Sequence, residues 1–99
     1  MSFESRFRTE VIDELFKAIL LLETEEDCYR FFEDLTTVPE IKSLAQRLQV
    51  AKMLMNNETY TSISEKTGAS TATISRVKNS LHYGAGGYKF ILHKLSEME

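Results

Sequence analysis

Cysteine, proline and glycine are scarce in this chain. Its 99 residues include one cysteine, one proline and four glycines, against four tyrosines and six phenylalanines. This composition excludes collagenous, low-complexity and disordered classes and favours a mostly helical domain. The single thiol, Cys28, cannot form an intrachain disulfide, and one cysteine supplies no zinc cluster of the usual spacing. We therefore expect a reducing, intracellular compartment and no metal site.

Long apolar runs are also absent. The longest unbroken run, Ala18–Leu22, is far too short to span a bilayer, and residues 1–6 contain no apolar signal core. We expect no membrane partner and a cytoplasmic location. The chain length is close to that of one domain and leaves no room for separate catalytic and regulatory domains, so residues 1–99 are predicted to form a single domain.

The charged residues are unevenly distributed along the chain, whose formal net charge is −3. Residues 1–40 hold four basic and eleven acidic residues, whereas residues 41–99 hold eight basic and four acidic residues. Salt screens charges beyond about 8 Å under physiological conditions, so local charge decides whether a surface contacts phosphate. The negative total therefore does not exclude a nucleic-acid partner.

Apolar residues recur at helical spacing in several segments. The first segment, Phe3–Leu22, carries a stripe rich in Phe, Ile and Leu that must pack on another helix. Thr24 and the acids that follow it predict a second helix that runs to about Leu35. Thr37 and Glu40 fit a capping box that starts a third helix. The predicted apolar face of this third helix consists of Ile41, Leu44, Ala45, Leu48, Ala51 and Met55.

A terminal helix is predicted over residues 88–98, after the glycine-rich stretch Gly84–Gly87. Together with two helices in the segment 59–81, this makes six helices and no strands, so the predicted fold class is all-α. One short chain has few places to bury both terminal stripes, so we expect residues 1–57 and 88–98 to contain dimerisation helices. The residues expected to lie between two copies are Phe7, Leu15, Ile19, Leu92 and Leu95.

The segment 59–81 has the pattern of a helix-turn-helix. Thr59 can cap a short helix that reaches Thr67, and Ser70 can cap a second helix. Between them, Gly68 supplies the positive φ that a tight turn needs. The apolar positions that such a motif buries are Ile63, Ile74 and Val77.

Polar and basic residues on the second of these helices suit the major groove of DNA. Small hydroxyls permit close approach, arginine can pair with guanine or phosphate, asparagine can pair with adenine, and threonine or alanine methyls can touch thymine. We predict that this helix reads double-stranded DNA and that replacing Thr73 alters the base preference. The candidate DNA-binding residues are Tyr60, Thr61, Ser70, Thr71, Ala72, Thr73, Ser75, Arg76, Lys78 and Asn79.

Three strings in the chain, RLQVAKML, TGASTATISRVKNSL and HYGAGGYKFIL, resemble the Trp repressor family, in particular its YerC/YecD-type branch. The similarity covers residues from about Leu35 to Leu95 and is strongest in ATISRVKNSL. The resemblance implies a six-helix Trp repressor-like fold with a central helix-turn-helix, arranged as an intertwined homodimer. It also implies a transcriptional regulator, expected to be a repressor, that binds a palindromic operator.

The resemblance further implies an effector pocket. Arg47 and Arg76 match the two arginines that flank the tryptophan bound by members of the family, and Ser80 matches a serine near its amino group. Where those members have a glycine, this chain has Val77, whose branched side chain overpacks the slot at a cost of about 1–3 kcal/mol. We therefore expect tryptophan not to be the corepressor. Another small effector, or binding that needs no ligand, stays open, and Arg47 would then pair with a carboxylate.

The sequence gives little support for an enzyme, and no cofactor is expected. His82 and His93 lie on separate segments and form no zinc pair, and Gly84–Gly87 lacks the context of a phosphate-binding loop. Cys28 lies on an apolar helix face and fits a packed thiol. The alternative function is a helical protein-interaction module in which the helix-turn-helix is only a scaffold. Steep weakening of binding by salt would indicate DNA instead.

Overall fold

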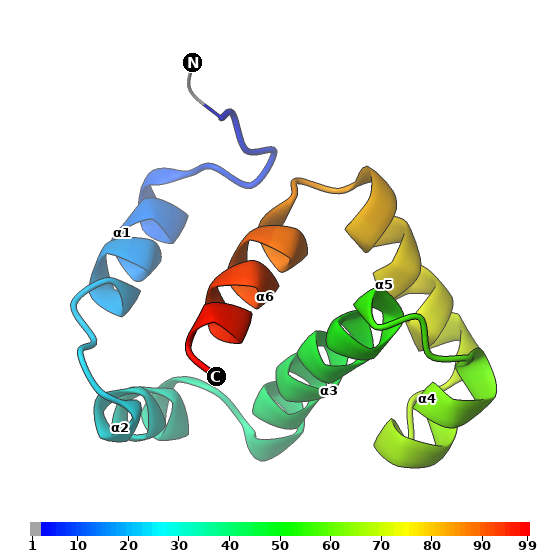
Figure 1. Ribbon diagram of the computed structural model, residues 1–99. Helices are drawn as coiled ribbons and strands as arrows, with labels where there is room; N and C mark the ends of the chain where they lie inside the picture. The colour runs from blue at the N-terminus through cyan, green and yellow to red at the C-terminus, as the bar shows by residue number, and fades with distance from the viewer. Residues whose placement is uncertain (1–2) are drawn as a thin grey trace. The chain divides into compact units, whose positions relative to one another are not determined.

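The structure is a computed structural model that describes residues 3–99. Within these residues it contains six helices and no strand (Figure 1), which confirms the all-α fold class. The helices are α1 (Glu10–Ile19), α2 (Glu25–Leu35), α3 (Val38–Met55), α4 (Tyr60–Thr67), α5 (Thr71–Tyr83) and α6 (Gly87–Glu97). The chain divides after Thr37 into two compact units, the first with α1 and α2 and the second with α3 to α6.

Side-chain caps fix the starts of three helices. Thr24, Thr59 and Ser70 each accept a hydrogen bond from the backbone N–H three residues later, at 3.0 to 3.1 Å. Each bond satisfies a donor that would otherwise have no partner at a helix N-terminus. The predicted starts of α2, α4 and α5 are confirmed.

The first helix is shorter than the prediction over Phe3–Leu22. Thr9 caps α1, because its Oγ1 accepts the N–H of Ile12 at 3.1 Å, and the helix begins only at Glu10. The residues before Thr9 form a turn, in which the Phe7 N–H donates to Ser5 Oγ at 3.0 Å. The apolar spacing continues through the cap, so spacing alone extends the predicted helix too far.

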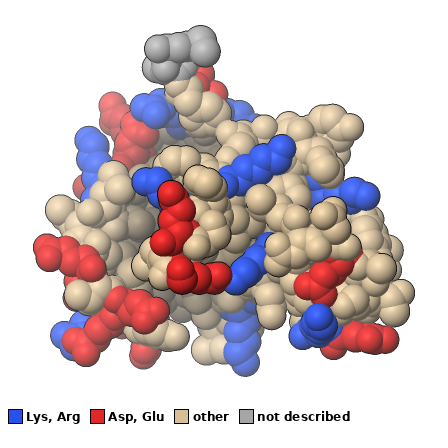
Figure 2. Space-filling view, viewed as in Figure 1, with Lys and Arg blue, Asp and Glu red and all other residues tan. Residues whose placement is uncertain are grey.

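The two helices of the first unit have no residue that is fully buried within the chain. On α1, Val11 is 77% exposed and Phe16 is 53% exposed. Cys28 of α2 is also exposed, so its predicted role as a packed thiol is wrong for the single chain. Acidic side chains gather over α2 (Figure 2), where Arg30 and Glu26 form an ion pair at 3.1 Å.

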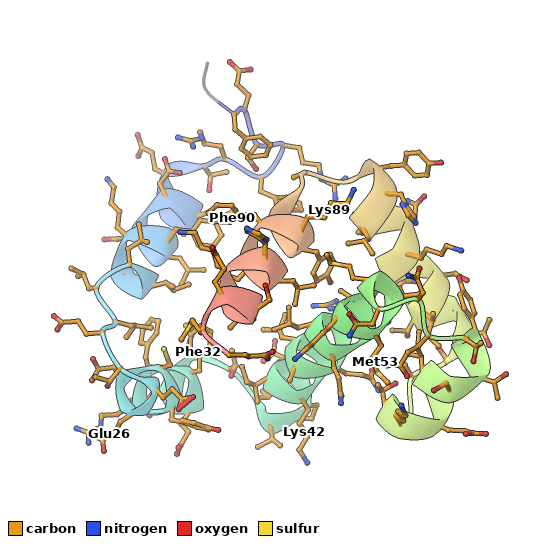
Figure 3. All side chains as sticks on the ribbon, viewed as in Figure 1. Glu26, Phe32, Lys42, Met53, Lys89 and Phe90 are labelled. Carbon is orange, nitrogen blue, oxygen red and sulfur yellow. The ribbon has the colours of Figure 1, made fainter. Side chains whose placement is uncertain are left out.

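α3 is the central helix of the second unit. It contacts α4, α5 and α6, and α5 also contacts both α4 and α6 (Figure 1). Met53 points from α3 toward α4 (Figure 3). The buried core of this unit consists of Val50, Ala51, Met53, Ile63, Ala69, Ile74, Val77 and Leu92.

The predicted apolar face of α3 is only partly right. Val50 and Met53, which lie outside the predicted set, are buried, whereas Ile41, Leu44 and Met55 are 38–44% exposed. The predicted face is the more apolar one in sequence, but α4 and α5 pack against the side that carries Val50 and Met53. The helix-turn-helix packs on one side of α3, and the other side remains exposed within the chain.

Leu92 of α6 differs from its predicted place between two copies. It is only 7% exposed and belongs to the core of its own chain, because α6 packs against both α3 and α5. Leu95, one turn later, is 39% exposed. The terminal helix therefore supports the helix-turn-helix directly.

The part of the chain that the structure describes contains no helix long and apolar enough to cross a membrane. Among the same residues, no three His, Cys, Asp or Glu side chains lie together as potential metal ligands. The two histidines lie on separate helices, His82 on α5 and His93 on α6. His93 Nε2 lies 3.9 Å from Glu97 Oε1, one turn along the same helix.

Gly84 follows α5 at a point where a side chain has no room. Its N–H donates to the Ser80 carbonyl oxygen at 2.8 Å, and a Cβ on Gly84 would collide with that same oxygen. Gly87, the first residue of α6, differs because a Cβ there would meet no heavy atom within 4 Å. Of these two positions, therefore, only position 84 requires glycine for steric reasons.

We expect Gly84→Ala to lower the free energy of unfolding by about 2 kcal/mol, because the obstructing atom belongs to the backbone of the last turn of α5. The control Gly87→Ala should change this free energy by less than about 1 kcal/mol. Urea unfolding followed by circular dichroism, at one fixed protein concentration, measures both variants. Equal stability of the two variants would contradict the steric argument.

Candidate nucleic-acid interface

The turn between α4 and α5 is held by its own backbone and side chains. Gly68 has a φ of 75°, in the region that strains other residues, and its N–H donates to the Ser64 carbonyl oxygen at 2.8 Å. Thr67 Oγ1 donates to the Ile63 carbonyl oxygen at 2.7 Å and accepts the Ala69 N–H at 3.1 Å. These bonds set the direction in which α5 leaves the turn, and the predicted role of Gly68 is confirmed.

Three buried aliphatic side chains hold α5 against the rest of the second unit. Ile63 of α4 and Ile74 of α5 are 0% exposed, and Val77 of α5 is 2% exposed. They share one core with Val50 of α3. Gln46 of α3 adds a polar contact, because its Nε2 donates to the last carbonyl oxygen of α4 at 3.1 Å. The three positions that the motif is predicted to bury are therefore buried.

The opposite face of α5 is exposed. Ala72, Ser75, Arg76 and Asn79 follow the spacing i, i+3, i+4 and i+7, so they lie on one face of the helix. All four are exposed, and we name them the α5 stripe. In helix-turn-helix proteins, the residues near the start of the second helix contact base edges.

Ser70 and Thr73 lie beside the α5 stripe, and their hydroxyls are already engaged. Ser70 Oγ accepts the Thr73 N–H at 3.1 Å and donates to Thr73 Oγ1, also at 3.1 Å. Thr73 is half-buried. Both residues therefore serve the start of α5, and the residues of the α5 stripe are freer than Thr73 to meet a ligand.

The start of α4 lies next to α5. Tyr60 Oη lies 3.4 Å from Ser75 Oγ, within hydrogen-bonding distance. Lys78 Nζ lies 5.7 Å from the centre of the Tyr60 ring, which is the geometry of a cation–π contact. Thr61 and Thr71 are exposed nearby in the chain, at the first turns of α4 and α5. The structure thus brings Tyr60 together with two of the other predicted residues.

The surface of the helix-turn-helix carries positive charge. No Asp or Glu occurs between residues 66 and 96, a stretch that holds five Lys and Arg residues. Within residues 3–99, neither Arg76 nor Lys78 forms an ion pair. Two cations on α5 are therefore available to an anionic partner.

Glu58, which precedes α4, is already occupied by other partners. Lys66 Nζ lies 2.9 Å from Glu58 Oε1, and Ser62 Oγ donates to the same oxygen at 3.0 Å. The hydrogen bond from Lys66, followed by the one from Ser62, lowers the pKa of Glu58 below its ordinary value. This carboxylate stays ionised, and Lys66 offsets its charge.

The predicted effector residues occupy two helices. Arg76 and Ser80 are exposed and lie one turn apart on α5, while Arg47 is half-buried on α3. Val77, which lies between Arg76 and Ser80 in the chain, is 2% exposed and packs in the core with Ile63. Arg47 forms no ion pair among the described residues, so the alternative prediction of a carboxylate partner is not met within one chain.

The fold and the site define an all-helical protein with a helix-turn-helix whose second helix is basic and exposed. Residues 10–96 match the family described as Trp repressor protein. The chain belongs to the Trp repressor family. This membership makes a helix-turn-helix regulator the broad functional class.

Relatives support the assignment over nearly the whole chain. The chain is 53% identical over 94 residues to the uncharacterized protein YerC of Bacillus subtilis (strain 168), covering 95% of this chain and 90% of YerC. A structure of a candidate Trp repressor from Staphylococcus aureus has 56% identity and a TM-score of 0.88, over 92% of this chain and 91% of that one. A TrpR-like protein from Eubacterium eligens ATCC 27750 has 52% identity and a TM-score of 0.89, over 92% and 94%. The predicted Trp repressor-like fold is confirmed.

A second group of basic residues becomes apparent only in the structure. His82 of α5 and Lys89 of α6 line one cavity together with Tyr60 and Lys78. These residues are distant along the chain, and only the packing of α5 against α6 brings them together. The feature of the sequence that could have indicated this basic group is the absence of carboxylates between residues 66 and 96.

Proposed function

We propose that the protein is a sequence-specific DNA-binding transcriptional repressor that places α5 in the major groove. The observation that carries this proposal is the exposed α5 stripe, on a helix that its own core holds in place. Arg76 can pair with guanine and Asn79 with adenine, while Lys78 beside the stripe suits a backbone phosphate. The other predicted contact residues flank this stripe at the first turns of α4 and α5.

The proposed functional unit is a homodimer on a palindromic operator. Large apolar side chains stay exposed within one chain, among them Val11 (77%), Leu20 (82%) and Leu44 (44%). Exposed apolar surface of this extent is typical of an interface between chains. A two-fold dimer would present two α5 helices to major-groove segments about 34–36 Å apart. The apolar faces of α1 and α3 therefore support a dimer.

We further propose that DNA binding does not depend on tryptophan. The Val77 side chain is part of the core, together with Ile63 and Ile74. A helix that is already fixed by this packing needs no ligand to become competent for DNA. A different small effector remains compatible with this arrangement, and its site would lie elsewhere.

A protein-interaction module is the alternative function. The exposed apolar residues of α1 and the acidic surface of α2 favour it. It does not account for the α5 stripe, or for a run from residue 66 to residue 96 without a single carboxylate. DNA binding accounts for both features, since phosphate repels carboxylates.

Two variants of α5 separate base contacts from backbone contacts, once an operator has been selected from random DNA. We expect Arg76→Ala to cost about 1–3 kcal/mol on the selected operator and much less on random DNA. Lys78→Ala should weaken binding to all sequences alike and reduce the slope of log Kd against log salt by about one. Gel-shift titrations at several salt concentrations measure both effects, with Lys94→Ala on α6 as the control.

Equal losses on every sequence for Arg76→Ala and Lys78→Ala would leave only attraction to the DNA backbone. The proposal of specific reading would then be wrong. Capture of a protein partner that persists at high salt, with no DNA bound at low salt, would favour the interaction module instead.

The dimer is tested by light scattering at micromolar concentration, where the wild-type mass should be twice the 11.4 kDa of one chain. Val11→Glu should shift the mass toward one chain, because an unpaired carboxylate would be buried in the interface. Glu14→Gln, at an exposed site of the same helix, is the matched control and should remain dimeric. A monomeric wild type with full helicity would contradict the dimer.

The independence from tryptophan is tested at Val77. Millimolar L-tryptophan should leave the operator affinity of the wild type within about twofold. The reason is that tryptophan would not bind the DNA-competent state of the protein more tightly than any other state. Val77→Gly should loosen α5 and open a cavity beside Arg76. Calorimetry and gel shifts with both proteins measure these effects. Micromolar tryptophan binding by the wild type, with a gain of about tenfold or more in DNA affinity, would show that the proposal is wrong.

A further inference from the structure

A cavity of about 510 Å³ lies within the second unit, next to the helix-turn-helix. The end of α3, the start of α4, the second half of α5 and the start of α6 all contribute to its walls. Figure 3 shows Lys89 on the first turn of α6, on the side toward α5. The lining residues that matter for its chemistry are Leu54, Glu58, Tyr60, Lys78, Leu81 and Lys89.

The walls of this cavity are positively charged. Lys78 and Lys89 come from different helices, and neither forms an ion pair within residues 3–99. Glu58 is the one acidic residue in the lining, and Lys66 offsets its charge at 2.9 Å. His82 is also in the lining. The cavity therefore attracts an anion.

The floor of the cavity is apolar. Leu81 is buried and Leu54 is half-buried, and the exposed Met55 also lines the cavity. The aromatic ring of Tyr60 forms part of the wall and faces Lys78 at 5.7 Å. A concave site with an apolar floor and a few convergent polar groups is typical of small-molecule binding. A DNA phosphate, which has no apolar body, would leave this floor uncovered.

We propose that this cavity binds a small organic anion, with a carboxylate or phosphate group between Lys78 and Lys89 and an apolar body against Leu54 and Leu81. The site is separate from Arg47, Val77 and Ser80, none of which line it. Its ligand class is therefore set by two ammonium groups and an apolar floor.

The position of the cavity gives its ligand a regulatory effect, and this second step depends on the proposed DNA binding. Lys78 and Tyr60 belong both to the cavity wall and to the predicted DNA contacts, and Tyr60 reaches Ser75 of the α5 stripe at 3.4 Å. An anion bound to Lys78 neutralises the charge that would face phosphate. Because binding effects are reciprocal, the anion weakens DNA binding and DNA weakens the binding of the anion.

Binding is tested directly with three probes on the full chain: phenyl phosphate, benzoate and the neutral benzyl alcohol. Amide and methyl NMR titrations at constant ionic strength follow the signals of Leu81 and Met55. We expect the two anions to bind and benzyl alcohol to bind at least about fivefold more weakly. Lys89→Gln should weaken the binding of the anions by about fivefold, because one of the two ammonium groups is lost. Lys94→Gln, on the same helix but outside the cavity, should leave the binding unchanged.

Three outcomes would overturn the cavity proposal. One is failure of both anions to bind the wild type, and another is equal binding of all three probes. The third is equal loss of binding in Lys89→Gln and Lys94→Gln, which would indicate diffuse surface charge. Preference for phenyl phosphate over benzoate, or the reverse, identifies which anionic group the site takes. None of these measurements involves DNA, so failure of the proposed function would leave their outcome unaffected.

The regulatory step is tested by gel shift with the selected operator. Phenyl phosphate should weaken DNA binding by the wild type and by Lys94→Gln at the same concentrations, at constant ionic strength, whereas Lys89→Gln should need about fivefold more of it for the same effect. Without a probe, Lys89→Gln should bind the operator as tightly as the wild type. A large loss of DNA affinity in this variant without probe would assign the cavity cations to the DNA backbone and overturn the proposal.

Discussion

Burial of Ile63, Ile74 and Val77 against α3 is the constraint on which the rest of the second unit depends. Removing one large aliphatic side chain from water contributes about 1.5–3 kcal/mol, so these contacts outweigh the individual hydrogen bonds of the turn. By fixing which face of α5 is buried, they also determine which face stays exposed. The α5 stripe is therefore a consequence of core packing, and the helix needs no partner molecule to present it.

Local features of the helix-turn-helix could be predicted from sequence because each depends on residues within a few positions. Thr59 and Ser70 each cap a helix by accepting the N–H of the third residue that follows, and Gly68 itself adopts the positive φ that the turn needs. Resemblance to the Trp repressor family supplied the arrangement of the remaining helices, which no local rule contains. The DNA contacts and the effector residues stay predictions, since they concern molecules other than this chain.

Features that depend on competition between interactions could not be predicted in this way. The apolar spacing of the first helix runs through Thr9, and the cap at this residue decides where α1 starts. The more apolar face of α3 in sequence holds Ile41 and Leu44, yet the packing of α4 and α5 buries the side with Val50. Lys78 and Lys89 line one cavity although they lie on different helices, so the sequence around one of them gives no indication that the other is close.

The missing carboxylates between residues 66 and 96 also affect how the protein approaches a polyanion. Its isoelectric point of about 5.4 describes an acidic molecule, yet the acidic residues are concentrated in residues 1–40. Under the proposed DNA binding, a duplex repels the acidic residues of the first unit and attracts the basic residues of the helix-turn-helix. The acidic residues of the first unit thereby weaken the overall attraction to the duplex, but they also disfavour contacts made through the first unit in place of the helix-turn-helix.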